Sequence, residues 1–249
     1  MELSRLTTVD AADRDVAVAL LPVGSTEQHG PHAPLGTDTI AAEAVATRAG
    51  EQVPDVIVGP TLPIGVAAEH RHFTGTLWVS PDTFRAYVRE TMESLAAHGW
   101  DRVIVVNGHG GNVDALREVC ATVRREGTCL GVPFTWFDAV DPADQPMGHG
   151  GGLETAAMRY LEPETVREDR TEVAATEGSD RWGDWHGGTN LAVDTIEFSR
   201  SGVVGDPRTT DAADGERFIT TAVEALVDLI GAVRDRQLRS DEEGGDAAD

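Results

Sequence analysis

One loop, residues 22–38, constrains this chain more than any other stretch. It reads Pro-Val-Gly-Ser-Thr-Glu-Gln-His-Gly-Pro-His-Ala-Pro-Leu-Gly-Thr-Asp. The apolar run before it, 16–21, is too short for a helix and predicts a buried strand. The alanine-rich stretch after it, 39–48, predicts a helix that ends near Gly50. Because α/β proteins place their chemistry at the carboxyl ends of buried strands, this loop is a candidate site.

The loop carries four side chains that can bind a metal ion: Glu27, His29, His32 and Asp38. Its glycines and prolines favour a fixed, irregular backbone. Carboxylates combined with imidazoles suit Zn, Mn or Fe(II). The alternative is an ordinary structural turn with scattered polar residues.

The remaining patterns predict an α/β domain. A buried strand at 102–106, a glycine-rich turn and then a helix form a βαβ pattern, which indicates a parallel sheet. The chain shows no linker or repeat, so we expect one domain, 1–239, and an acidic disordered tail, 240–249. Further strands are expected at 53–58, 76–79 and 129–137, and helices at 80–98, 113–126, 154–161 and 211–238. The weakly periodic segment 167–205 includes a tryptophan-rich stretch, 182–186, expected at a pocket rim.

The charge balance excludes several classes of partner. The net charge of −23 and the pI near 4.5 argue against nucleic acid, because phosphate repels such a surface. No apolar run approaches the roughly 18 residues that span a bilayer, so we expect a cytoplasmic protein with no membrane partner. All basic residues are arginine, which favours a halophilic source over an acidic mesophile with GC-rich DNA. Cys120 and Cys129 form neither a disulfide framework nor a metal pair, and we expect both to be buried thiols.

Histidines and acidic residues recur in other loops of the chain. The segment 107–112, Asn-Gly-His-Gly-Gly-Asn, lacks the Gly-Lys-Ser/Thr ending of a phosphate loop, and its central histidine favours a metal. There is no Gly-x-Ser-x-Gly nucleophile motif. Hydrolysis by metal-activated water is the chemistry that remains. The other candidate side chains in loops are those of His70, His72, His149, Glu154 and His186.

Five segments in order resemble the creatininase family of metal hydrolases. They are 22–38, Glu69-His70 before Gly75-Thr76, 107–112, Gly148-His149-Gly-Gly-Gly-Leu-Glu154-Thr155, and Gly202-Val-Val-Gly-Asp-Pro207. The resemblance implies a three-layer α/β/α fold with a mostly parallel central sheet. It also implies two divalent metal ions (Zn, Fe(II) or Mn), a small-molecule substrate and a homo-oligomer.

The same resemblance assigns roles to individual residues. Glu27, His29, Asp38 and His109 match the family's metal positions, with Asp38 as the bridging carboxylate. Creatininases carry a glutamate where this chain has Gly111, and we expect Glu154 to replace it as a ligand or as a general base. We also expect that Gly111→Glu restores metal binding when Glu154 is removed. His149 is the expected proton shuttle to the leaving nitrogen of an amide or formamide.

With glycine at position 111, the motif 108–112 (Gly-His-Gly-Gly-Asn) resembles two branches of the family other than true creatininases. One is the archaeal deformylase that acts on a formylamino-pyrimidine ribotide (2-amino-5-formylamino-6-ribosylaminopyrimidin-4(3H)-one 5'-monophosphate). The other is the peptidase that trims the mycofactocin precursor. A halophilic archaeal source favours the deformylase, and creatinine amidohydrolase is a further alternative. A metallophosphatase and a non-catalytic, metal-stabilised binding protein are the rivals from other classes.

Overall fold

The computed structural model describes residues 1–236. The principal strands are β1 (Val18–Val23), β2 (Val56–Val58), β3 (Arg102–Asn107) and β4 (Leu130–Thr135). The helices are α1 (Thr8–Ala12), α2 (Thr37–Gln52), α3 (Pro81–Ala97), α4 (Val113–Arg125), α5 (Gly152–Leu161), α6 (Thr171–Thr176) and α7 (Ala212–Arg234). A two-stranded ribbon, β5 (Trp185–His186) and β6 (Thr189–Asn190), lies apart from the main sheet.

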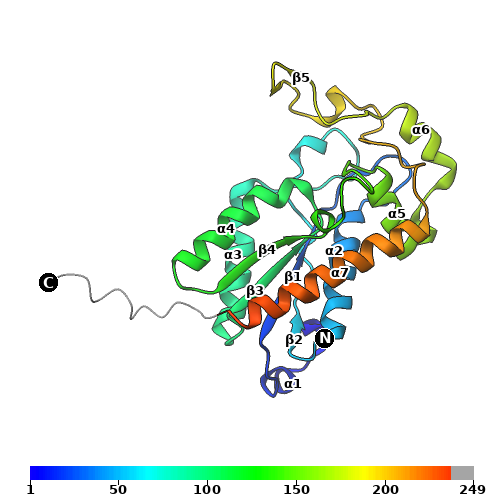
Figure 1. Ribbon diagram of the computed structural model, residues 1–249. Coiled ribbons are helices and arrows are strands. Elements are labelled where there is room, and N and C mark those ends of the chain that lie inside the picture. The colour runs from blue at the N-terminus through cyan, green and yellow to red at the C-terminus, as the bar shows by residue number, and fades with distance from the viewer. Residues whose placement is uncertain (237–249) are drawn as a thin grey trace.

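The main sheet has the strand order β2-β1-β3-β4, and all its pairs are parallel. β1 and β3 run side by side from Ala19↔Val103 to Val23↔Asn107. Their carboxyl ends therefore lie at the same edge of the sheet, and the loops that follow them emerge together (Figure 1).

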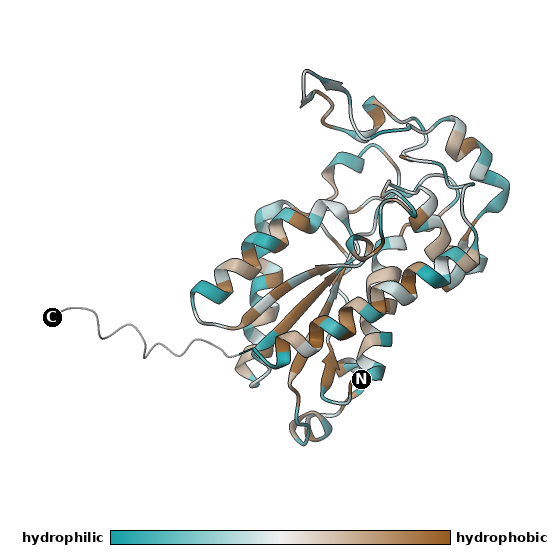
Figure 2. Cartoon of the chain, viewed as in Figure 1, coloured by the Kyte–Doolittle hydropathy of each residue, from teal (hydrophilic) through white to brown (hydrophobic). Residues whose placement is uncertain are grey.

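Helices cover both faces of this sheet, which makes three layers (Figure 1). Successive residues of a strand point to opposite faces. Leu20 and Ile104 pack into a core with α2, α5 and α7, whereas Leu21 and Val105 pack into a second core with α3 and α4. Figure 2 shows the strands as continuous apolar segments, as expected where a sheet is buried on both faces.

Local sequence signals explain where several helices begin. The Ser80 hydroxyl accepts a hydrogen bond from Thr83 N at the start of α3, and Pro81 occupies the first turn. Asp211 caps α7 through the amides of Ala213 and Asp214.

Two close backbone contacts bring distant segments together. A Cβ at Gly215 of α7 would lie 1.9 Å from Ala156 O of α5, so only glycine permits this helix crossing. A Cβ at Gly108 would lie 2.0 Å from Asp38 O, so glycine also permits the loop after β3 to reach the first turn of α2. The fold thus draws the start of α2 against the end of β3.

The predicted fold is largely confirmed, with local corrections. The segment 76–79 is not a strand, since Leu77 makes only a bridge to Thr26. The sequence signal misled because short apolar runs do not distinguish strands from packed loops. The segment 167–205 holds α6 and the β5–β6 ribbon, neither of which was predicted. The predicted tail, 240–249, lies outside the described residues. Within residues 1–236, no helix is long and apolar enough to cross a membrane.

Candidate metal centre

The candidate ligands come from four segments at the carboxyl edge of the sheet. Glu27 and His29 follow β1, and Asp38 lies in the first turn of α2. His109 follows β3, and Glu154 lies in the first turn of α5. All five side chains are buried, from 0% exposure at Glu27 to 4% at His109 and Glu154.

The carboxylate of Asp38 lies between two histidines. Its Oδ1 is 3.0 Å from His29 Nε2, and its Oδ2 is 3.1 Å from His109 Nδ1. Each of these nitrogens also lies near a second carboxylate: Glu154 Oε2 is 3.6 Å from His29 Nε2, and Glu27 Oε1 is 3.2 Å from His109 Nδ1. The arrangement is two ligand sets that share one carboxylate.

The donor set fits metal ions. Within residues 1–236, three groups have ligand atoms within 4.8 Å of one another: Glu27/Asp38/His109, His29/Asp38/Glu154 and Glu27/His29/His149. Several of their buried atoms have no hydrogen-bond partner, among them both carboxylate oxygens of Glu27, His29 Nε2 and Asp38 Oδ2. Buried polar groups without partners are costly, and a divalent ion would satisfy these atoms together.

The buried carboxylates favour the protonated form of the histidines that would bind the ions. Burial alone would lower the pKa of His29, but the Asp38 and Glu154 carboxylates outweigh it and raise the pKa well above its usual value. Burial likewise opposes the charge of His109, and Glu27 and Asp38 raise its pKa. Burial of Asp38 acts to raise its pKa, but the two histidines lower it overall. In the metal-free protein, the imidazolium groups therefore neutralise the carboxylates.

Gln28 sets the orientation of two further histidines. Its amide nitrogen donates to His70 Nδ1 at 2.8 Å and to Gly202 O at 3.0 Å, while its Oε1 accepts from Gly30 N. His70 therefore carries its proton on Nε2, 3.5 Å from Glu27 Oε1. Burial and the neighbouring His149 lower the pKa of His70, which keeps it neutral.

His149 presents an unprotonated nitrogen to the centre. Its Nε2 donates to Gln28 O at 2.6 Å, so its 2.8 Å contact with the Gln28 amide nitrogen is not a hydrogen bond. In the neutral ring, Nδ1 is then an acceptor, and it lies 3.7 Å from Glu27 Oε1. Burial, followed by the nearby His29, lowers the pKa of His149 and favours this neutral form.

Gly111 has no room for a side chain. A Cβ there would lie 2.3 Å from Val66 O and 2.5 Å from His109 Nε2, and 3.1 Å from Glu69 Oε1. The contact with the main chain at Val66 argues against the expectation that Gly111→Glu restores metal binding. The Glu69 carboxylate borders the same space, and burial raises its pKa.

Besides His70, three of the histidines considered from the sequence lie outside the ligand groups. His32 is buried, and its Nε2 is 2.8 Å from Thr155 Oγ1, so it fastens the loop after β1 to α5. His72 contacts Asp194 at 3.0 Å. His186 is exposed on β5.

The sequence reading missed several residues that support the site. Asn107 Oδ1 accepts from His109 N at 3.1 Å, and Asn112 bonds both Val66 N and Gly24 O. The sequence did offer a signal for these two, because Asn107 and Asn112 stand at the two ends of the segment 107–112, on either side of His109. Gln28 lay unnoticed between two candidate ligands. Asp194 and Thr195 gave no signal, because they lie in a weakly periodic segment.

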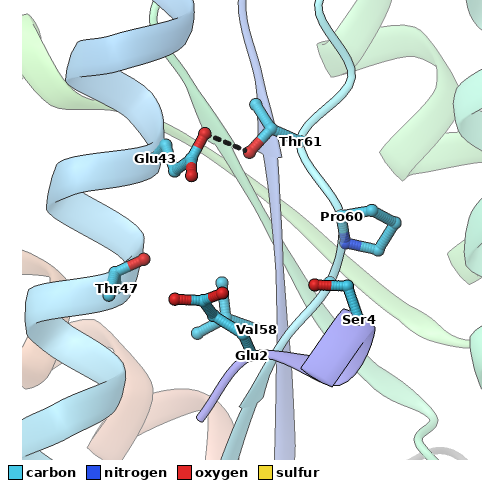
Figure 3. Close-up of a pocket in the computed structure, with 8 residues that line it drawn as sticks. Glu2, Ser4, Glu43, Thr47, Val58, Pro60 and Thr61 are labelled. Carbon is cyan, nitrogen blue, oxygen red and sulfur yellow. Dashed lines mark hydrogen bonds between the residues drawn. The ribbon is translucent and has the colours of Figure 1, made fainter. Parts of the chain in front are cut away.

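A small cavity lies elsewhere, between α2 and the segment after β2. Its volume is about 50 Å³, and Glu2, Glu43 and Thr61 are among the residues that line it (Figure 3). Thr61 Oγ1 donates to Glu43 Oε2 at 3.0 Å. Neither carboxylate belongs to a metal-ligand group within the described residues, so this cavity is separate from the candidate centre.

This chain is similar to known proteins over most of its length. Residues 2–230 match the family model Creatininase, described as creatinine amidohydrolase. The mycofactocin precursor peptide peptidase of Mycolicibacterium smegmatis is 37% identical over 222 residues, covering 86% of this chain and 85% of the relative. The creatinine amidohydrolase of Pseudomonas putida is 28% identical over 236 residues, covering 86% of this chain and 88% of the relative.

Solved creatininase structures share the fold. A mutant of the Zn-Zn type has a TM-score of 0.78 at 26% identity, covering 94% of this chain and 98% of the other. A structure described as "Creatininase Mn" has a TM-score of 0.79 at 26% identity, covering 94% and 99%. The three-layer α/β fold and the resemblance inferred from sequence are thereby confirmed.

Proposed function

This chain belongs to the creatininase family, whose members are metal-dependent hydrolases of amide C–N bonds, and on that premise we propose that it cleaves an amide bond of a peptide precursor. The observation that carries the proposal is Asp38, whose two oxygens face His29 and His109 at 3.0 and 3.1 Å. Such a carboxylate can join two metal positions.

The proposed ligand sets divide the five side chains. Glu27, Asp38 and His109 would hold one ion, and His29, Asp38 and Glu154 the other. Zn, Mn and Fe(II) all accept carboxylate and imidazole ligands. When bound, the pair of ions would supply Lewis acidity and lower the pKa of water toward neutrality.

We assign proton transfer to His149. Its Nε2–H is held by Gln28 O, so its Nδ1 can accept a proton and pass it to the leaving nitrogen. An amide nitrogen must be protonated to leave, because the amide anion is too basic. Gln28 fixes the ring for this task, and His70 Nε2 faces Glu27 on the other side.

The proposed substrate follows from the relatives. The relative at 37% identity is named as a peptidase of the mycofactocin precursor peptide, whereas the creatinine amidohydrolase is 28% identical. A peptide amide is therefore favoured over creatinine. Hydrolysis of a formylamino-pyrimidine ribotide has no comparable support among these relatives and stays a prediction.

A substrate panel tests the proposal. The protein, loaded separately with Zn, Mn and Fe(II), is assayed against a mycofactocin-type precursor peptide, creatinine and the formylamino ribotide. We expect turnover of the peptide and none in Asp38→Asn. Turnover of the ribotide or of creatinine, with the peptide intact, would overturn the substrate assignment.

The role of His149 has its own test. His149→Gln should lower kcat by about 10²–10⁴-fold, the usual contribution of general acid–base catalysis, and retain both metal ions. Loss of an ion on this substitution would instead make His149 a ligand, as the group Glu27/His29/His149 would allow.

A further inference from the structure

A tryptophan ring borders the candidate centre. The indole of Trp182 lies 5.8 Å from the ring of His70 and 5.9 Å from that of His149, nearly perpendicular to both at 78° and 80°. These two rings stack on each other at 4.2 Å. Trp182 therefore contacts the side of the site that holds the proposed proton shuttle.

The exposure of Trp182 contrasts with that of its neighbours. The indole is 39% exposed, whereas His149 is 5% exposed and His70 is fully buried. A ligand that approaches His149 from this side must pass the indole. Burying an exposed aromatic ring against an apolar group is favourable, so the ring can bind part of that ligand.

The local backbone fixes the position of Trp182. Its carbonyl accepts a hydrogen bond from Trp185 Nε1 at 2.6 Å, and its ring meets Phe198 at 5.6 Å. The next residue, Gly183, has φ +80°, and Asn190 Oδ1 accepts from Asp184 N nearby. The indole is therefore held before any ligand arrives, which lowers the entropic cost of binding.

A second set of contacts fastens this segment to the body of the protein. Asp194 is 6% exposed and lies 2.6 Å from Arg71 and 3.0 Å from His72. Thr195 Oγ1 is 3.1 Å from His70 Nδ1. Figure 1 shows the segment with β5 beyond the carboxyl ends of the strands, at the end of the molecule where the candidate site lies.

We propose that Trp182 is a specificity-determining residue, which binds an aromatic or large apolar group next to the scissile amide. This inference rests on the proposed function, since it takes the centre beside His149 as the place of hydrolysis. Small amides would gain nothing from the indole. The preferred substrate is therefore a peptide amide flanked by such a side chain.

Binding of two hydroxamates tests the inference without requiring turnover. Hydroxamates bind divalent metals through their two oxygens, and acetohydroxamate and phenylacetohydroxamate differ by one phenyl ring. Calorimetry on the zinc-loaded protein should give about tenfold tighter binding of the phenyl compound. Trp182→Ala should bring the two Kd values within about twofold of each other.

Three other variants test whether the preference depends on the aromatic ring of Trp182 or on the structure of the segment that carries it. Trp182→Phe keeps an aromatic ring and should keep most of the preference. Leu191→Ala removes an apolar side chain that is 60% exposed in the same segment, and it should keep the preference in full. Should Trp182→Ala fail to fold, Trp182→Leu retains apolar bulk without a ring and should lower the preference at least threefold.

The outcomes separate the two proposals. Equal affinities in the wild type, an undiminished preference in Trp182→Ala, or a lost preference in Leu191→Ala would overturn the role of Trp182 alone. Absence of binding by both hydroxamates, or binding unaffected by Asp38→Asn, would overturn the metal-dependent function and the inference with it.

Discussion

The imidazole of His109 is fixed by the carbonyl of Val66, which accepts a hydrogen bond from Nε2 at 2.7 Å. The proton on Nε2 leaves Nδ1 as the nitrogen that faces Glu27 and Asp38. Partners of this kind orient histidine ligands and raise their basicity. The segment before η2 (Ala68–His70) therefore acts on the centre through its main chain.

Gly111→Ala should destabilise the protein by about 1–3 kcal/mol, the usual cost of overpacking. The added Cβ would lie within 2.5 Å of both atoms of the His109–Val66 hydrogen bond. Urea unfolding of the variant measures the change. Gly110→Ala is the matched control, because a Cβ there meets nothing within 4 Å. Equal stability of the two variants would contradict the steric argument.

Asp38→Asn and Glu154→Gln should differ in metal stoichiometry. The first removes the shared carboxylate and should lose both ions, while the second should lose only the ion on the His29 side. Activity should fall by more than the roughly 100-fold that follows loss of an outer partner. Elemental analysis gives the stoichiometry, with exposed Glu164→Gln as control. Full occupancy in Glu154→Gln would exclude Glu154 as a ligand.

Metal binding should release about two protons near neutral pH. The pKa values of His29 and His109 are raised well above 6.5 in the metal-free protein, so each imidazole must lose a proton to bind an ion. Affinity should consequently fall as the pH is lowered. Calorimetric titration in buffers of different ionisation enthalpy counts the protons, and a count of zero would show that neither histidine is a ligand.

His32 should make the fold sensitive to acid. Burial lowers the pKa of His32 from 6.5 to about 4, so the unfolded chain binds the proton more readily. The contribution of neutral His32 to the free energy of unfolding is complete above pH 6.5 and is lost as the pH falls to 4. The loss amounts to about 3 kcal/mol at ~1.36 kcal/mol per pH unit. His32→Gln should show a shallower loss between these pH values in urea unfolding. An identical slope would contradict the shifted pKa.

The halophilic source inferred from composition remains a prediction, and salt tests it. With a net charge of −23, repulsion among carboxylates should fall in any salt. A salt-adapted protein should continue to gain stability up to about 1 M KCl. A Tm that stops rising near 0.15 M, where the Debye length is ~8 Å, would indicate ordinary screening.

The sequence predicted the strands that are buried on both faces and the helices that are amphipathic. The expected strand 102–106 is β3, Arg102–Asn107, because its apolar run matches a central parallel strand. The β5–β6 ribbon was missed because Trp185, His186, Thr189 and Asn190 form two-residue strands without alternation. The expected homo-oligomer remains a prediction.

For the site, the sequence identified the ligand types but not their mutual geometry. Glu27, His29, Asp38, His109 and Glu154 do converge, and their roles as ligands remain proposals. The orientation of His149 depends on Gln28 O, and a main-chain contact of this kind leaves no mark in the sequence. The lack of space at Gly111 likewise comes from Val66 O, 45 positions earlier in the chain.

The crossing of α5 and α7 at Ala156 and Gly215 determines when the centre can be completed during synthesis. Glu154 stands two positions before Ala156, on a helix whose buried face packs against Phe218, Ile219 and Ala222 of α7. A chain synthesised only through residue 154 contains Glu27, Asp38 and His109. It lacks α7, the helix against which α5 packs. The candidate centre can therefore be complete only after α7 (Ala212–Arg234) has been synthesised and has packed against α5.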